Sequence, residues 1–208
     1  AVTDCVPLWC KTNYSFLEGA SHPDELIQRA HKLGYTAIGI ADRDGVYGIV
    51  RAHVAAQEHG LRVCIGSEVS LNDGTTLVLL ASNREGYANL CRLITRGRIQ
   101  HPKGTCSVSY RDVCEHAKGL LALWGGDRSA LVSADHFHPA TADQLRDAFG
   151  DALYAMLSRH QRDSEPLEEA RLRHRAARWE LPLVGTTEVL YHVASRRRLQ
   201  DEIGRAHV

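Results

Sequence analysis

Three short segments decide how this sequence is interpreted: Leu8-Trp9-Cys10-Lys11-Thr12, Ala41-Asp42-Arg43-Asp44-Gly45 and Gly66-Ser67-Glu68. Each lies at the end of an apolar run that predicts a β-strand. In α/β barrels the functional side chains gather at the C-terminal ends of the strands. Asp42 and Glu68 are side chains that a metal ion accepts there. Trp9, Lys11 and Arg43 are not, because an indole does not ligate and a cation repels a metal ion.

Strand-like and helix-like segments alternate along the chain. The first helix is expected after Ser21, with Ser21 as its cap, Pro23 in its first turn and Gly34 just past its end. Apolar runs predict seven strands: Val6–Cys10, Tyr35–Ala41, Leu61–Ile65, Thr76–Ala81, Leu120–Trp124, Ala152–Leu157 and Leu183–Gly185. Further helices are expected over Val46–His59, Glu85–Thr95 and Asp163–Trp179, and a loop over Arg96–Cys106. This alternation favours parallel strand pairing in a barrel or a doubly wound sheet.

Composition limits the classes of function. The 208 residues carry 25 basic and 25 acidic side chains, whereas a free-standing nucleic-acid binder is usually basic. This segment alone is therefore expected to bind DNA poorly. No apolar stretch is long enough to span a membrane and no signal peptide precedes the first strand. The six cysteines form no C-x-x-C pair, which favours reduced, mostly buried thiols in a cytoplasmic protein over a zinc site.

One long run carries a family resemblance: LWCKTNYSFLEGASHPDELIQRAHKLGYTAIGIADRDGVYGIVRAH, residues 8–53. It resembles the N-terminal PHP (polymerase and histidinol phosphatase) domain of bacterial family C DNA polymerases, in particular the error-prone branch related to the DNA polymerase III alpha subunit. The similarity continues through GSEVSL, LVLLASNREGYANLCRLITRGR, GLLALWGGDRS and LPLVGTTEVLYH, and covers about Ala1 to Asp201. The resemblance implies an α/β fold, a distorted seven-stranded (β/α) barrel of the PHP type.

The resemblance also implies where a metal site would lie. Active PHP domains carry His-x-His on the first strand, Asp-His on the second and Glu on the third, and their two or three metal ions hydrolyse phosphoesters. Here the first-strand histidines are replaced by Trp9 and Lys11. Asp42 survives, but Arg43 replaces the histidine that follows it. Glu68 survives on the third strand.

The later strands are altered too. Thr76 replaces the histidine that opens the fourth strand. In the last motif Glu188 stands for an aspartate, and Leu190 replaces a histidine. His192 is the one histidine expected near the barrel mouth.

We expect Lys11 and Arg43 to form ion pairs with the surviving carboxylates in place of a metal cluster. The favoured interpretation is a structural domain with no catalytic residue, no bound metal and no cofactor of its own. Two alternatives stay open: a residual phosphoesterase or exonuclease using Asp42, Glu68, Glu188 and His192, and a module that binds partners of the polymerase complex.

The resemblance implies that the parent protein is a DNA-directed DNA polymerase, a nucleotidyltransferase of damage-tolerant DNA synthesis and repair. Its magnesium would lie in a palm domain absent from this segment, which is expected to lack polymerase activity. The implied partners are DNA through the parent polymerase, the remainder of that chain, and mutasome or sliding-clamp components. We expect a cytoplasmic protein without membrane contact.

Other features receive weaker interpretations. His136 and His138 form an H-x-H pair in a loop expected to lie off the barrel, and the basic runs Arg96–Lys103 and Arg196–Arg198 could contact DNA or another domain, or be solvated. Residues 202–208, Glu-Ile-Gly-Arg-Ala-His-Val, depart from the family pattern. One codon choice for them, GAG ATC GGA AGA GCA CAC GTC, resembles a sequencing-library adapter. We therefore expect a PHP domain over 1–201 and a non-native tail over 202–208, with a natural divergent tail as the alternative.

Overall fold

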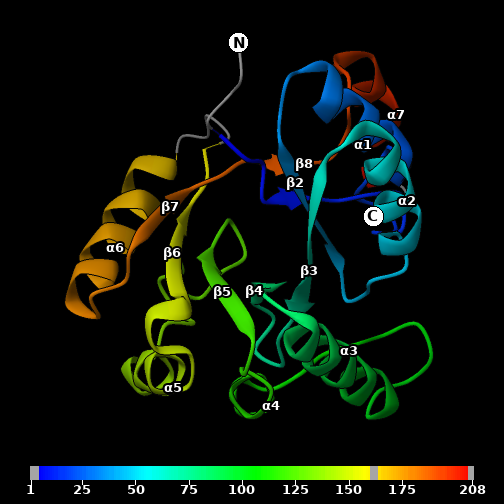
Figure 1. Cartoon of the computed structure of the whole chain (residues 1–208). Helices are drawn as coiled ribbons and strands as arrows, with labels where there is room; N and C mark the ends of the chain where they lie inside the picture. Colours follow the sequence, from blue (N-terminus) through cyan, green and yellow to red (C-terminus); the bar gives the residue numbers. More distant parts are fainter. Residues whose placement is uncertain (1–4, 160–163, 206–208) are drawn as a thin grey trace. The chain divides into compact units, whose positions relative to one another are not determined.

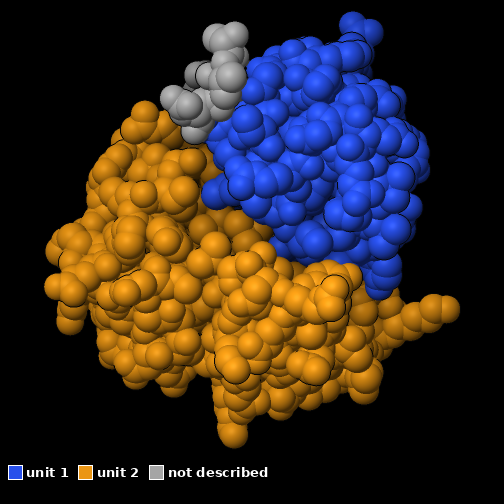
Figure 2. Space-filling view, in the orientation of Figure 1, with its two compact units in different colours: residues 1–67, 187–208 blue, residues 68–186 orange. Residues whose placement is uncertain are grey.

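The computed structural model describes residues 5–159 and 164–205. The chain divides into two compact units (Figure 2). The first contains residues 1–67 and 187–208, and the second contains residues 68–186.

The first unit begins with two strand–helix repeats, and the strand of the first repeat has only two residues (Figure 1). Its elements are β1 (Trp9–Cys10), α1 (Pro23–Lys32), β2 (Ala37–Arg43), α2 (Ile49–His59), the first part of β3 (Arg62–Ser70), β8 (Glu188–Val189), a 3-10 helix (Ala194–Arg196) and α7 (Arg197–Arg205). The strand order in this unit is β3-β2-β1-β8, and β1 pairs in parallel with both β2 and β8. The last segment of the chain is thereby joined to its first strand.

Apolar periodicity explains how α1 packs against β2. Helix α1 buries Leu26, Ile27 and Ala30, which recur at the spacing of one helix face. These side chains belong to one core cluster with Ile38 and Ile40 of β2. Such burial stabilises a fold by about 25 cal/mol per Å² of apolar surface removed from water. Cys10 of β1, the residue before Lys11, belongs to the same cluster.

The helix ends follow the sequence signals in part. Pro23 opens α1, and Gly60 ends α2 in the left-handed conformation with φ +66°. Ser21, expected as the cap of α1, does not cap it: the cap residue is His22, whose N–H donates to the Glu25 carboxylate at 2.8 Å. The Ser21 hydroxyl is instead engaged with His192.

The second unit contains the end of β3 and four further strands. Its elements are the end of β3, β4 (Thr76–Ala81), α3 (Arg84–Ile99), α4 (Tyr110–Glu115), β5 (Leu120–Gly125), α5 (Pro139–Phe149), a 3-10 helix (Gly150–Ala152), β6 (Leu153–Leu157), α6 (Glu165–Arg178) and β7 (Leu183–Gly185). The strand order is β7-β6-β5-β4-β3. β5, β6 and β7 are parallel, whereas β4 and β5 are antiparallel.

Three expectations about local structure were wrong. The pairing is not parallel throughout, because β4 runs against β5. The described residues contain eight strands instead of seven, since β8 is a separate two-residue strand. The loop expected at Arg96 begins later, because α3 continues to Ile99 and buries Gly97.

Two further expectations concern regions outside the core. Residues 202–205, expected to be a non-native tail, continue α7, whereas residues 206–208 lie outside the described part of the chain. Among the described residues, no helix is both long and apolar enough to cross a membrane.

Candidate functional site

Lys11 is the centre of the candidate site. Its side chain is 1% exposed and follows β1 directly. The ammonium donates to Glu18 Oε2 at 2.6 Å and to Glu188 Oε1 at 2.5 Å. It also lies 5.3 Å from the centre of the Trp9 ring. A buried ammonium is costly unless it is paired, and two carboxylates supply that pairing.

The loop between β1 and α1 brings Glu18 to Lys11. The loop doubles back on its own strand, so that a Cβ on Gly19 would lie 2.0 Å from the Thr12 carbonyl oxygen. Only glycine fits this approach. Leu17, immediately before Glu18, has a φ of +64°, a conformation that costs a non-glycine residue energy. Glu18 was not singled out by its sequence pattern, because it lies in a loop and not at a strand end.

Arg43 binds the same carboxylate from the end of β2. Its Nε lies 2.6 Å from Glu18 Oε1, and its Nη2 donates to Glu18 Oε2 at 3.2 Å. The Nη2 contact is a hydrogen bond, whereas Nε lies close to Oε1 without the alignment of one and contributes as an ion pair. The Arg43 side chain is 17% exposed, so water screens the pair only partly. Glu18 thus receives both cations that the sequence analysis expected to replace ligands.

Asp42 lies beside this group but is used differently. Its carboxylate is almost fully buried and accepts from the Thr12 N–H at 2.6 Å, the Thr12 hydroxyl at 2.8 Å and the Ser15 hydroxyl at 2.6 Å. Burial raises the pKa of Asp42 above its usual value, although these hydrogen bonds and the charge of Lys11 act to lower it. Asp42 therefore fixes the loop after β1.

Ser67 secures the backbone of the same turn. Its hydroxyl donates to the Asp42 carbonyl oxygen at 2.8 Å and accepts from the Gly45 N–H at 3.1 Å. Asp44, between them, has a φ of +49°. The turn after β2 is thus held in an unfavourable conformation by hydrogen bonds from a neighbouring strand.

β8 supplies the second carboxylate. Glu188 lies opposite Trp9 in the parallel register of β1 and β8, and the Lys11 N–H donates to the Val189 carbonyl oxygen at 2.9 Å. Leu190, at the position of an expected ligand, contributes its carbonyl oxygen, which accepts from the Ala20 N–H at 2.8 Å. The position has become a backbone anchor for the loop that carries Glu18.

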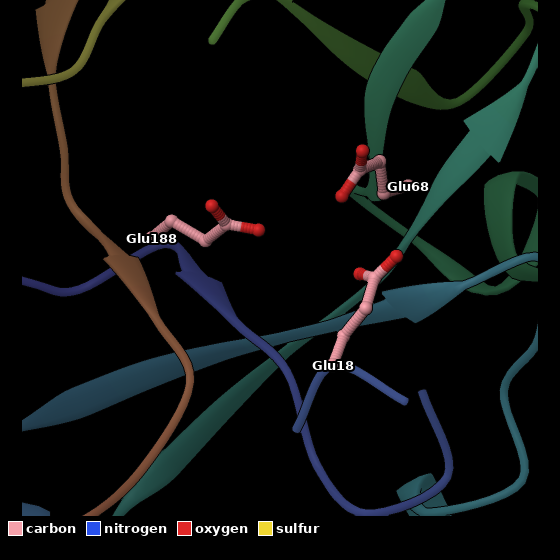
Figure 3. Close-up of side chains that lie close together, drawn as sticks. All are labelled: Glu18, Glu68 and Glu188. Carbon is pink, nitrogen blue, oxygen red and sulfur yellow. The ribbon is translucent and has the colours of Figure 1, made fainter. Parts of the chain in front are cut away.

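Glu18 and Glu188 each direct a carboxylate inward, and one oxygen of each lies within 4.8 Å of the other (Figure 3). Figure 3 also draws Glu68, the first residue of the second unit, which is buried on β3. Thr76 of that unit is buried at the start of β4, where its N–H donates to the Arg128 carbonyl oxygen at 2.9 Å.

His192 belongs to a separate network within the first unit. The ring Nδ1 of His192 lies 2.7 Å from the Ser21 hydroxyl, and the backbone N–H of His192 donates to the same oxygen at 2.9 Å. Glu25 lies 3.9 Å from the ring and accepts from Arg196 at 2.7 Å. These contacts attach the segment after β8 to the start of α1.

The other candidate ligands do not gather. His136 and His138 are exposed, and His136 contacts Ser133 at 3.0 Å. Within the described residues of the first unit, the carboxylates of Glu18 and Glu188 lie close enough to share a metal ion, and no histidine or cysteine joins them. The cysteines are free thiols, but only Cys10 is fully buried, so the expectation of mostly buried thiols was wrong.

Sequence comparison places these features in a family. The profile of the PHP domain matches residues 8–160, which is most of the chain. The chain belongs to the PHP domain family. The fold class expected from the sequence, an α/β fold of the PHP type, is thereby confirmed.

Two curated relatives of this chain are error-prone DNA polymerases. This PHP domain is 39% identical over 202 residues to the error-prone DNA polymerase of Rhodopirellula baltica, and the match covers 94% of this chain. It is 41% identical over 194 residues to the error-prone DNA polymerase of Pseudomonas aeruginosa, covering 93% of this chain. The chain spans 18% of the length of each of these two proteins.

Solved structures agree on the fold. A putative metal-dependent phosphoesterase from Bifidobacterium adolescentis aligns with a TM-score of 0.61 and 17% identity, covering 96% of both chains. A lesion-specific endonuclease from Pyrococcus furiosus aligns with a TM-score of 0.55 and 14% identity, covering 90% of this chain and 48% of the endonuclease. At these identities the likeness extends to the fold alone.

Proposed function

We propose that this PHP domain is part of a longer DNA polymerase of the error-prone type, and that it acts there as a structural domain without metal chemistry. The identity to error-prone polymerases over more than nine-tenths of the chain supports the first part. The parent protein would extend a primer on damaged DNA in the cytoplasm, with its magnesium bound outside this domain. The partners of the domain would then be the remainder of the polymerase and, through it, DNA.

The buried ammonium of Lys11 is the observation that carries the second part. Glu18 and Glu188 are the carboxylates that a divalent ion would use, and Lys11 already lies against both. Arg43 adds a second positive charge to Glu18. A metal ion at this position would be repelled by two cations and would lack the nitrogen ligands that a catalytic zinc site prefers. The residues present therefore do not fit the metal cluster of active PHP domains.

The same contacts support a structural role. Lys11 joins the strand that opens the chain to Glu188, which lies 177 residues later. It also holds the Glu18 loop, which Arg43 binds from β2. Breaking a buried ion pair by removing one partner typically costs about 3–5 kcal/mol, because the other charge is stranded. The pairs thus fix three strands of the first unit.

Elemental analysis and hydrolysis assays test this proposal together. The 208-residue chain is purified without chelator, dialysed against buffer containing Mn²⁺ and Zn²⁺, and freed of loose metal by gel filtration. The expected result is less than one tightly held ion per chain. No hydrolysis of p-nitrophenyl phosphate or of single-stranded DNA ends is expected with either ion. Two or more ions per chain, or hydrolysis that a chelator abolishes, would overturn the metal-free role.

A second candidate is a residual metal-dependent phosphoesterase. It is supported by the convergence of Glu18 and Glu188, whose oxygens lie within 4.8 Å, and by the fold shared with a putative metal-dependent phosphoesterase. This activity would require Lys11 to leave the carboxylates. Metal-dependent hydrolysis that disappears in Glu188→Gln would support it over the structural role.

A further inference from the structure

The longest stretch without an acidic residue lies on the second unit. Between Glu85 and Asp112 the sequence contains no aspartate or glutamate, although the chain as a whole carries equal numbers of acidic and basic residues. Five basic residues fall in this stretch: Arg92, Arg96, Arg98, Lys103 and Arg111. They occupy the second half of α3, the loop that follows it and the start of α4 (Figure 1). Neutral overall charge thus conceals a local positive surface.

Acidic neighbours compensate only one end of this surface. Arg96 pairs with Asp112 and Glu115, each at 2.9 Å. Arg111 pairs with the same glutamate at 2.9 Å. These pairs hold α3 against α4, whereas Arg92 and Lys103 form no ion pair within the described residues.

Two of the basic residues, Arg92 and Lys103, face solvent with their charge available. Arg92 is exposed and donates to the neutral amide oxygen of Asn89 at 3.0 Å. Lys103 is exposed in the loop. Arg92 and Arg96 line a shallow recess on the solvent side of α3 together with Thr95 and Ile99. A polyanion lying beside this recess would meet the positive charge of Arg92 and Arg96, whereas the Thr95 hydroxyl already donates to the Cys91 carbonyl oxygen at 2.7 Å.

The loop is held in shape before any ligand arrives. His101 Nδ1 lies 2.8 Å from the Gly97 carbonyl oxygen, and its Nε2 lies 3.0 Å from the Ser107 hydroxyl. Ser107 in turn contacts Asn72 at 2.7 Å. Pinning both ends of the loop through one imidazole lowers the conformational entropy lost on binding.

We propose that the α3–α4 surface, defined by Arg92, Lys103 and the recess beside Arg96, binds the phosphodiester backbone of a nucleic acid. Exposed arginine and lysine side chains are donors that contact phosphates. Between Tyr87 and Tyr110 the sequence contains no Phe, Tyr or Trp, so bases have no large aromatic ring to stack on there. The binding is therefore weak, dependent on salt and indifferent to base sequence. This inference goes beyond the proposed function, since it concerns the 208-residue chain alone and requires no polymerase activity.

Fluorescence anisotropy with a labelled oligothymidylate of about twenty nucleotides tests the proposal. The dissociation constant at low salt is expected on the order of 10⁻⁵ M, as for non-specific binding. Arg92→Glu with Lys103→Glu should weaken binding about tenfold. Because single-stranded DNA gives about 0.7 per phosphate contact, the slope of log K against log salt should fall by about 1.4 for two lost contacts.

A charge-matched variant supplies the control. Arg29→Glu with Lys32→Glu changes the net charge equally on the exposed side of α1, outside the α3–α4 surface. Its affinity for the oligonucleotide should stay within about twofold of that of the unsubstituted chain, and circular dichroism should show both variants folded. Equal weakening by the two variants would overturn the proposal, because it would indicate diffuse electrostatics. No binding by the unsubstituted 208-residue chain would also overturn it, as would binding to phosphatidylserine vesicles but not to DNA.

Discussion

The Lys11 ammonium lies 2.5 Å from Glu188 Oε1, so the strand that opens the fold is fastened by one ion pair to a strand formed 177 residues later. Backbone pairing between Trp9 and Glu188 runs beside this contact. Neither strand is longer than two residues, and so few ladder hydrogen bonds join them. The side-chain pair therefore carries much of the attachment of β8.

Replacing Lys11 with alanine should destabilise the protein strongly. Glu18 and Glu188 would be left facing each other without a counter-charge, at a typical cost of about 3–5 kcal/mol. Urea denaturation followed by tryptophan fluorescence measures the loss. Lys32→Ala, on the exposed face of α1, is the matched control and should change the free energy of unfolding by less than about 0.5 kcal/mol. Comparable losses in the two variants would refute the role of Lys11.

The Lys11→Ala variant should also acquire a response to divalent cations. Two carboxylates within 4.8 Å would then offer oxygen ligands to Mn²⁺ with no ammonium between them. A ligand that binds only the folded state raises its stability, so millimolar Mn²⁺ should raise the melting temperature of the variant. The melting temperature of the unsubstituted chain should not rise with Mn²⁺. The doubly substituted chain, Lys11→Ala with Glu188→Gln, should lose the response; an undiminished response would place the ion elsewhere.

Arg43→Ala should lower stability more than Arg51→Ala. Arg43 is 17% exposed and pairs with Glu18 at 2.6 Å, whereas Arg51 is 49% exposed and pairs with Asp24 at 2.7 Å. Exposed pairs contribute about 0–1 kcal/mol, and partly buried ones more. Thermal unfolding of the two variants measures the difference. Arg43→His alone should bring no metal binding, because Trp9 and Lys11 still occupy the first-strand ligand positions.

The sequence predicted elements well where the signals are local. The strand over Thr76–Ala81 has the bounds expected from its apolar run, and the Pro23 and Gly34 signals bracket α1 closely. β8 was missed, because a two-residue strand has no periodicity of its own and exists through its pairing with β1. α4 was missed although Ser109 and Asp112 form a capping box, a signal that a closer search of the sequence could have found.

Gly97 shows why the end of α3 was misplaced. Glycine in a basic stretch predicts a loop, but here a Cβ would lie 2.8 Å from the Val108 side chain, so glycine allows the returning chain to pack on the helix. Tertiary packing outweighed propensity at this position.

The candidate site was predictable in kind but not in its partners. Strand ends pointed to Lys11, Asp42, Arg43 and Glu188. Glu18 was not predicted, because its position depends on a loop that turns at Leu17 and Gly19. Asp42 was grouped with the ion pairs, yet the hydroxyls of Thr12 and Ser15 bind it. Such contacts depend on backbone geometry that residue types alone do not specify.

Asp42 should give the protein a measurable pH dependence. Its folded-state pKa is raised by burial, whereas the unfolded chain has the ordinary value of about 3.9. Between these two values the folded state binds more protons than the unfolded state, so this group's contribution to stability falls as pH rises through the window. Asp42→Asn removes the titration. The free energy of unfolding of the unsubstituted 208-residue chain, relative to that of Asp42→Asn, should decline from pH 4 toward neutrality. A relative stability that rises over this range would contradict the raised pKa.

Two glycine substitutions should separate steric fit from backbone conformation. A Cβ on Gly86 would lie 1.8 Å from the Gly119 carbonyl oxygen, a backbone atom that cannot move without shifting the turn before β5. Overpacking of this kind costs about 1–3 kcal/mol and sometimes more. Gly60 has a φ of +66° with nothing within 4 Å of the added carbon, so Gly60→Ala should cost only the left-handed conformation, about 1–2 kcal/mol. We therefore expect Gly86→Ala to lower the melting temperature further than Gly60→Ala. The reverse order would mean that the approach of α3 to the segment before β5 is looser than these distances indicate.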